Sequence, residues 1–387
     1  MQTDFYAQMK KTHNILSLFA NIGIAEAYLE ELGNKVVVAN EIDPRRAKLY
    51  QAIYPESKMI CGDITEESVF DEILESSRSA GVNLIMATPP CQGMSTAGKM
   101  KKMDPRNSLF LYAIKLIKEL KPDYFLFENV PAFLVTNIIY NDSPTLIPDV
   151  IKQELDEDYH LEFMVRNTQD YGVPQRRERM ILLATKKGVS PQWQCPDPDK
   201  HMVTMEEAIG WIPIIDPFVK DLSEADFHRL FPKFEERKKT ALKISKYNIP
   251  TTHVYRNVLA MQHTPTGKSA FSNPPEFLPR KKNGEIVRGF GNTYKRQNWN
   301  TPAYTIAMDN IEISSQNNVH PGRPCGKDEK GNDLYSDARA LTLYELMILM
   351  TLPPNWNLPE WTDLKFFRRI IGEGVPSLFV KKLFMKI

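Results

Sequence analysis

The segment Thr88-Pro89-Pro90-Cys91-Gln92-Gly93 follows a short apolar run and places a cysteine directly after two prolines. Proline fixes the backbone, so the pair aims the residue that follows it. A free thiol has a pKa of about 8.5 and becomes a strong nucleophile only where its surroundings favour the thiolate. A lone cysteine is more often a buried structural residue. The polar, proline-flanked setting at the end of a predicted strand nevertheless favours a nucleophile at Cys91.

A carboxylate and a group of arginines follow later in the chain. Phe127-Glu128-Asn129-Val130-Pro131 ends the next predicted strand, so Glu128 lies beside Cys91 if the two strands are neighbours. Gln175-Arg176-Arg177-Glu178-Arg179 precedes another strand and offers cations for a phosphate or a carbonyl oxygen. By itself the arginine run is equally consistent with a charged surface.

Three earlier strand ends predict a nucleoside site. The run from Ser17 to Ile24 passes from a strand through a glycine-containing turn, where the backbone can approach a ligand closely. About twenty residues on, Glu41 ends the second strand, where an acid can bind both hydroxyls of a ribose. Asp63 follows the third strand and could accept from an adenine amino group.

Short apolar runs alternate with amphipathic segments in the first half, which predicts an α/β fold with a mostly parallel sheet. We expect strands at Ile15–Phe19, Lys35–Ala39, Lys58–Ile60, Asn83–Ala87, Tyr124–Phe127, His160–Thr168 and Arg179–Ala184. We expect helices at Ile24–Leu32, Arg45–Tyr54, Glu67–Glu75 and Ser108–Leu120, and again at Leu341–Met350 and Val375–Met385, where the chain returns to the first lobe.

The pattern changes from about Lys187, where prolines become frequent and the β/α alternation stops. Three short basic clusters appear at 237–239, 280–282 and 295–296, with aromatic residues between them: Phe271, Phe290, Tyr294 and Trp299. Cations for phosphates and rings for sugars or bases would suit a nucleic-acid surface. For any one cluster alone, a solvated charged face is the more common explanation.

Composition sets few limits. The chain has 387 residues with a formal net charge of +1, so a nucleic-acid-binding surface would require the basic residues to gather on one face. No stretch is long and apolar enough to span a bilayer, and the N-terminus lacks the segments of a signal peptide. Four cysteines at scattered positions predict neither a disulfide framework nor a metal site. We expect a protein of the reducing cytoplasm.

In this order, these motifs resemble the DNA (cytosine-5) methyltransferase family, of the bacterial restriction-modification type. Two C-terminal segments extend the resemblance: Arg339 to Glu345 followed by Leu352-Pro353, and Gly372-Glu373-Gly374-Val375-Pro376. The resemblance implies a Rossmann-like S-adenosylmethionine-dependent methyltransferase sheet with a smaller, irregular target-recognition domain. The implied domains are a catalytic domain over 1–186, a target-recognition domain over 187–335, and C-terminal helices over 336–387.

The resemblance also implies a mechanism. Cys91 adds to C6 of a cytosine swung out of the duplex, Glu128 engages N3 and the amino group, and Arg179, helped by Arg177, holds O2. C5 then takes a methyl group from S-adenosyl-L-methionine. The implied cofactor residues are Phe19, Ile22, Gly23, Ile24, Glu41, Ile42, Asp63, Ile64, Pro89, Glu373 and Val375.

Three positions depart from the family's pattern. The family's first motif usually has Asp where this chain has Ser17, and glycine where this chain has Asn21. The last motif more often has Asn in place of Glu373. We therefore expect catalysis to be retained with altered cofactor affinity. A non-catalytic DNA-binding regulator on the same fold is one alternative, although it would have no need of Cys91 and Glu128. A tRNA cytosine-5 methyltransferase is another, although the Cys-Phe-Thr segment of that branch is absent.

The family also implies partners. Double-stranded DNA is the expected substrate, and a cognate restriction endonuclease is the expected partner in the cell, by analogy. We expect a monomer that makes no membrane contact and binds no metal.

Overall fold

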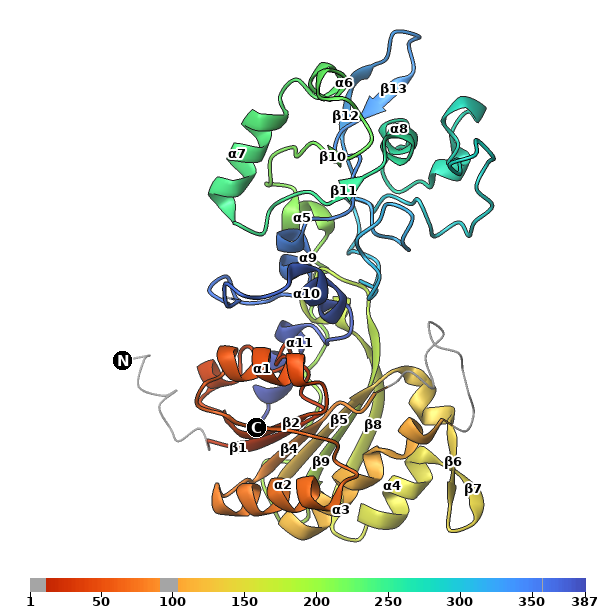
Figure 1. The fold of residues 1–387 in the computed structure, drawn as a ribbon. Coiled ribbons are helices and arrows are strands. Elements are labelled where there is room, and N and C mark those ends of the chain that lie inside the picture. Colours follow the sequence, from red (N-terminus) through yellow and green to blue (C-terminus); the bar gives the residue numbers. More distant parts are fainter. Residues whose placement is uncertain (1–11, 91–103, 357) are drawn as a thin grey trace.

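The computed structural model describes residues 12–90, 104–356 and 358–387, and it divides into a sheet lobe and a second, less regular lobe (Figure 1). The sheet lobe is built on seven strands in the order β3-β2-β1-β4-β5-β9-β8. The first five strands are parallel, and β9 runs antiparallel to both of its neighbours. The strands are β1 Asn14–Leu18, β2 Lys35–Glu41, β3 Lys58–Cys61, β4 Leu84–Ala87, β5 Tyr124–Asn129, β8 Tyr159–Asn167 and β9 Glu178–Lys186.

All seven predicted strands are therefore confirmed, each with ends within two residues of the expected ones. Successive strand residues face opposite sides of the sheet. Leu16 belongs to the core on one face, together with residues of α2, α3 and α4, whereas Ile15 belongs to the core on the other face, together with residues of α11. These helices span Glu67–Ser79 (α2), Phe110–Leu120 (α3), Ile147–Leu155 (α4) and Ser377–Phe384 (α11). The strand runs are apolar on both faces because helices cover both faces.

The expected helix over Ile24–Leu32 is wrong. The segment consists of turns that end in a 3-10 helix, η1 Glu30–Leu32. Its backbone hydrogen bonds join residues three apart: Leu29 N donates to the Glu26 carbonyl at 2.9 Å, and Leu32 N donates to the Leu29 carbonyl at 3.1 Å. Glu26 also turns inward, where its carboxylate accepts a 2.6 Å hydrogen bond from the Ser17 hydroxyl. This buried polar contact draws the segment toward the sheet in place of a regular α-helix.

The other expected helices are confirmed, and the structure also has elements that were not predicted. The confirmed ones are α1 Pro44–Ile53, α2, α3, α9 Leu343–Leu349 and α11. Apart from the elements between residues 205 and 335, the unpredicted helices and strands are α4, the hairpin of β6 Asn137–Tyr140 with β7 Ser143–Leu146, and α10 Leu364–Ile371. Short 3-10 helices connect the larger elements at η2 Pro105–Ser108, η3 Pro131–Val135, η4 Thr168–Tyr171, η5 Ala270–Ser272 and η6 Pro275–Phe277.

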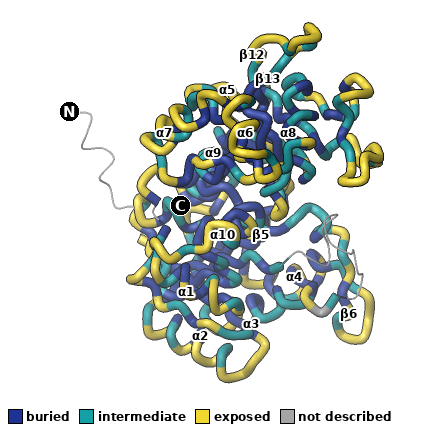
Figure 2. Tube along the Cα trace, turned by 45° about the horizontal axis from the view of Figure 1, so that its top comes forward, coloured by how far each residue is buried: buried dark blue, intermediate teal, exposed yellow. Residues whose placement is uncertain are grey.

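The second lobe has its own small core, formed by residues such as Val219, Phe227, Val258 and Val319. Figure 2 shows this buried interior beneath a largely exposed outer trace. Its elements are β10 Phe218–Val219, α6 Glu224–Leu230, α7 Phe234–Ile244, β11 Thr252–His253, α8 Tyr255–Gln262, β12 Pro324–Lys327 and β13 Asp333–Tyr335. Short strands and many turns match the irregular character expected of this region.

Helices α5 Met205–Ile209, α9 and α10 share a third core, which lies between the two lobes (Figure 1). Next to it, the buried guanidinium of Arg339 contacts Glu345 at 2.8 Å and Asp337 at 2.9 Å.

The chain does not leave the sheet lobe at Lys187. Trp193 is 1% exposed in the sheet-lobe core, and its indole donates to the Leu383 carbonyl at 2.9 Å. The separate core of the second lobe begins only at Val219.

Within the part of the chain that the structure describes, no helix has the length and apolar character needed to cross a membrane. The same residues contain no group of three or more His, Cys, Asp or Glu side chains arranged to hold a metal ion.

Candidate active site

The nucleophile segment begins at the carboxyl end of β4, which pairs in parallel with β5, so that Ala87 lies opposite Phe127. The two strands are thus neighbours, as the placement of Glu128 near the segment required. Cys91 itself lies outside the described residues. The side-chain amide of Asn129 donates to the Pro89 carbonyl at 3.0 Å, which fixes the backbone that leads to the cysteine.

Glu128 and Arg179 form a close ion pair. Arg179 Nε lies 2.7 Å from Glu128 Oε1, and each side chain is 13% exposed. The antiparallel pairing of β5 with β9 brings together these two residues, which lie far apart in the sequence. A carboxylate next to a guanidinium presents an acceptor for the amino group of a cytosine beside a donor for its carbonyl oxygen, and a proton shared with the carboxylate would meet N3. Both residues were predicted to belong to the site, and they are in contact in the structure.

Arg177 has a different set of partners. Its side chain is buried, and the guanidinium donates to the carbonyls of Ile306 at 3.2 Å, Gly372 at 2.9 Å and Glu373 at 3.1 Å. These contacts tie the segment that leads into the strand carrying Arg179 to the C-terminal segment. The expected help of Arg177 in holding a substrate oxygen stays a prediction.

Glu41 ends β2 and is buried, with 5% of its surface exposed. Its two carboxylate oxygens accept hydrogen bonds from the backbone N–H groups of Asn21 and Asp43, both at 2.9 Å. Burial is the main cause that raises the pKa of this carboxyl, and the two backbone donors oppose it. Since each oxygen has a second lone pair, the carboxylate can still accept from the two hydroxyls of a ribose.

The neighbouring surface fits the adenosine part of S-adenosylmethionine. Ile42 is 61% exposed directly beside Glu41, and an adenine ring would cover such an apolar side chain. Asp63 stands at the end of β3 with one carboxylate oxygen bonded to Thr65 N at 2.9 Å. The strand ends therefore bring Glu41, Ile42 and Asp63 to one edge of the sheet, as the sequence predicted.

The first turn has an unusual backbone. Phe19, Asn21 and Gly23 have φ values of 59°, 54° and 82°, in the left-handed region that suits glycine and, less well, asparagine. A Cβ on Gly23 would lie 2.1 Å from the ring of Tyr54, so only glycine fits there. Within this turn the backbone N–H groups of Ala20, Asn21 and Gly23 donate to the Asn40 carbonyl, the Glu41 carboxylate and the Ala20 carbonyl, so they hold the shape of the turn.

Several expected cofactor residues can contribute only through their backbone. Their side chains are buried in the cores that hold the turns in place, which leaves main-chain atoms to face a ligand. These residues are Ile22, at 0% exposure, Ile24 and Ile64, at 3%, and Val375, at 4%. Pro89 is buried as well.

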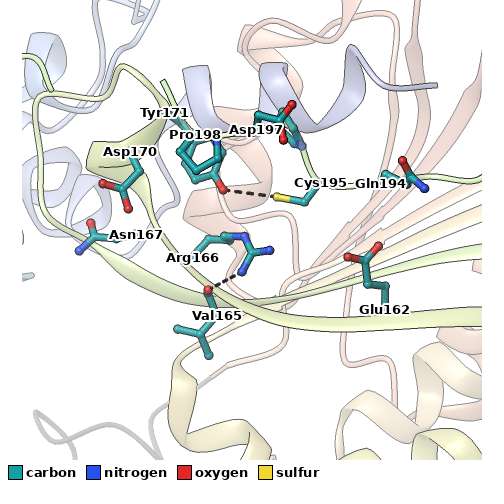
Figure 3. A pocket seen from close by; sticks show the side chains of 11 residues that line it. Glu162, Val165, Arg166, Asn167, Asp170, Tyr171, Gln194, Cys195, Asp197 and Pro198 are labelled. Carbon is teal, nitrogen blue, oxygen red and sulfur yellow. Dashed lines mark hydrogen bonds between the residues drawn. The ribbon is translucent and has the colours of Figure 1, made fainter. Parts of the chain in front are cut away.

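One hollow in the described structure lies away from these residues. It has a volume of about 610 Å³ and is lined by eleven residues of β8, η4 and the segment 194–198 (Figure 3). Tyr171 and Cys195 approach each other there, with the hydroxyl 3.5 Å from the sulfur. None of the expected site residues lines this hollow, so its size does not mark the reaction centre.

The basic and aromatic clusters of the second lobe separate into structural and exposed residues. Arg296 is fully buried and donates to four backbone carbonyls, while Tyr294 and Trp299 are 7% and 8% exposed. Phe271 packs against the lobe's core. Of the four expected aromatics, Phe290 alone is freely exposed, at 80%.

Asn129 was not predicted as a functional residue, although it lies within the motif that contains Glu128. The available signal was an amide immediately after the strand-end acid. The contact between Asn21 and Glu373, by contrast, joins positions 352 residues apart and leaves no local signal.

The chain matches the family model for C-5 cytosine-specific DNA methylases over residues 13–387. It is 40% identical to the type II methyltransferase M1.HgaI of Avibacterium volantium, over 98% of this chain and 99% of the relative. It is 28% identical to the type II methyltransferase M.XorII of Xanthomonas oryzae pv. oryzae, over 95% of this chain and 82% of the relative.

The fold also matches a solved DNMT2 mutant from Spodoptera frugiperda with a TM-score of 0.57, 18% identity, and coverage of 96% of this chain and 99% of that one. At this identity the match supports the fold alone. With the family match over nearly the whole chain, the protein belongs to the C-5 cytosine-specific DNA methylases and is a DNA (cytosine-5)-methyltransferase that uses S-adenosyl-L-methionine.

Proposed function

We propose that methyl transfer proceeds through a covalent bond between Cys91 and the target cytosine, with Glu128 and Arg179 holding the base. The observation that carries this proposal is the 2.7 Å Glu128–Arg179 contact at the carboxyl end of β5, beside the strand that leads to Cys91. The pair offers complementary hydrogen-bonding groups to a base edge. Its low exposure strengthens those bonds relative to bonds in water.

The steps follow from these roles. The Cys91 thiolate adds to C6, a proton shared between Glu128 and N3 neutralises the electron density that the addition places on N3, and Arg179 holds O2. The C5 carbon then supplies the electron pair of the new carbon–carbon bond. S-adenosylmethionine, when bound, would supply the methyl group, and the broken S–CH3 bond would leave its electron pair on the sulfur. A base removes the C5 proton, the C5–C6 double bond re-forms, and Cys91 leaves as the thiolate. Covalent addition divides one difficult step into easier ones.

The base must leave the duplex for this to happen, because C6 is shielded within the stack. We assign DNA recognition to the second lobe, within the region 187–335. Phe290 supports this assignment: it is 80% exposed, and Arg288 and the cluster at 280–282 lie close to it in the chain. Its position is also fixed, since the Phe290 carbonyl accepts from both the backbone N–H and the hydroxyl of Thr293 at 2.9 Å.

We further propose that the enzyme protects host DNA in a restriction-modification system, acts as a monomer in the cytoplasm, and is paired in the cell with an endonuclease of the same specificity. The support is the similarity, over nearly the whole chain, to two proteins that are named as type II methyltransferases. Digestion of DNA from cells that do and do not express the protein, with a panel of endonucleases, would test the protective role.

The test of the mechanism is covalent trapping. Native protein and a Cys91→Ser variant are incubated with the cofactor and a long duplex of mixed sequence that contains 5-fluorocytosine, which has no removable C5 proton. A denaturation-resistant complex that forms with the native protein and not with the variant is expected. A complex on similarly substituted tRNA, but not on DNA, would contradict the assigned substrate. A complex that persists in the variant would contradict the assigned nucleophile.

A further inference from the structure

Two of the three positions that depart from the family's pattern touch each other. The side-chain amide of Asn21 donates to Glu373 Oε2 at 3.2 Å. Arg46, on α1, meets the same carboxylate with both terminal nitrogens, at 2.9 Å to Oε2 and 3.1 Å to Oε1. One carboxylate from the last segment is therefore held by the first turn and by the first helix together.

This contact lies next to Glu41, the expected ribose acid. Asn21 donates its backbone N–H to Glu41, the ribose acid, and its side-chain amide to Glu373. Arg46 also acts on Glu41, since its positive charge is among the causes that lower the pKa of that carboxyl against the larger effect of burial. The backbone of Glu373 is fixed from behind by Arg177. The contacts link both ends of the chain around a single edge of the sheet.

The partial burial of these side chains strengthens the contacts between them. The side chains of Arg46 and Glu373 are only 23% and 17% exposed, so solvent screens the ion pair less than it screens a surface pair. The bidentate approach of a guanidinium also fixes the orientation of the carboxylate. A glycine at position 21 would supply no amide, and an asparagine at position 373 would supply no charge for Arg46.

We propose that Asn21, Arg46 and Glu373 form a clasp that holds the C-terminal segment against the first turn and thereby sets the affinity for S-adenosylmethionine. The clasp organises the site before the cofactor arrives, which lowers the ordering cost of binding. The two departures from the family's pattern thus compensate each other. The inference rests on the cofactor position assigned above, at Glu41.

The experiment is a double-mutant cycle with Asn21→Gly and Glu373→Ala, read out as the dissociation constant for S-adenosylmethionine in equilibrium dialysis without DNA. We expect each single variant to bind about tenfold more weakly, which corresponds to the loss of about 1.4 kcal/mol. The double variant should bind little worse than either single one, because both substitutions remove the same contact. Additive losses would overturn the clasp.

Arg46→Gln and Arg45→Gln provide a matched pair on the same helix. Arg45 is 72% exposed at its side chain and pairs with Asp43, so its variant should bind the cofactor like the native protein. Arg46→Gln should raise Kd and KM for the cofactor about tenfold, while kcat at saturating cofactor stays within about twofold. Equal affinity in the two variants would overturn the clasp.

A further variant, Glu41→Gln, distinguishes a failure of the assigned cofactor position from a failure of the clasp. Weakened binding in this variant, with native affinity in Arg46→Gln and Asn21→Gly, would leave the cofactor position standing and refute the clasp. Native affinity in Glu41→Gln would contradict the cofactor position itself, and the clasp with it. Thermal unfolding of each cofactor-free variant, with a midpoint close to that of Arg45→Gln, confirms that the affinities describe folded protein.

Discussion

Glu26 is a buried acid whose replacement should make the protein more stable, and increasingly so as the pH rises. Its side chain accepts the Ser17 hydroxyl at 2.6 Å, and its second oxygen is buried without a hydrogen-bond partner among the described residues. Burial raises the pKa of this carboxyl from 4.5 to about 7, against the smaller lowering effect of the Ser17 bond. The substitution to examine is Glu26→Gln, which keeps the acceptor for Ser17 and cannot ionise.

The sign follows from proton linkage. The folded protein binds the Glu26 proton more tightly than the unfolded chain, so this contribution to stability is complete below pH 4.5 and is lost as the pH rises through about 7. The full loss is about 3 kcal/mol, because each unit of pKa is worth about 1.4 kcal/mol. The free energy of unfolding of Glu26→Gln, relative to the native protein, should therefore increase by about 2 kcal/mol between about pH 5.5 and 8.5.

The assay is urea unfolding of both proteins across this pH range, with Glu30→Gln as the control. Glu30 is exposed and follows in the same segment, so its replacement should leave the pH dependence unchanged. A difference between Glu26→Gln and the native protein that stays constant with pH would refute the reasoning, because it would mean that Glu26 does not take up a proton on folding near neutral pH.

Three further substitutions test the site. Asn129→Ala removes the amide that holds the segment before the nucleophile, and should slow single-turnover methyl transfer about 100-fold while cofactor affinity stays native; an unchanged rate would contradict the tether. Arg179→Lys loses the Nε contact to Glu128, and should lower kcat/KM by about 100-fold or more in a tritiated-methyl assay. Phe290→Ala should weaken DNA binding about tenfold in a fluorescence titration. Trp361 is another exposed aromatic residue, at 53%, and Trp361→Ala should leave the affinity for DNA unchanged. Equal effects of the two aromatic variants would argue against a specific role for Phe290.

Much of the sheet lobe was predictable from local patterns. The strands are short apolar runs with helices on both faces, so their positions depend on composition over a few residues. The segment from Ile24 to Leu32 was not predictable in this way. Its apolar spacing is typical of a helix, but the buried contact between Glu26 and Ser17 favours a tighter path. A polar contact with a neighbouring strand outweighed the local preference.

The order of the strand-end motifs determined the family, the cofactor and the reaction, because parallel strands bring their carboxyl ends to one edge whatever lies between them. Which of two similar side chains does which task depended on tertiary contacts. Arg177 and Arg179 are two residues apart, yet one grips backbone carbonyls and the other meets Glu128. In the second lobe, Arg296 and Phe290 belong to one basic and aromatic stretch, yet one is buried and the other is exposed. A sequence lists the donors that are available, but their partners come from segments that only folding brings near, as the contact between Asn21 and Glu373 shows.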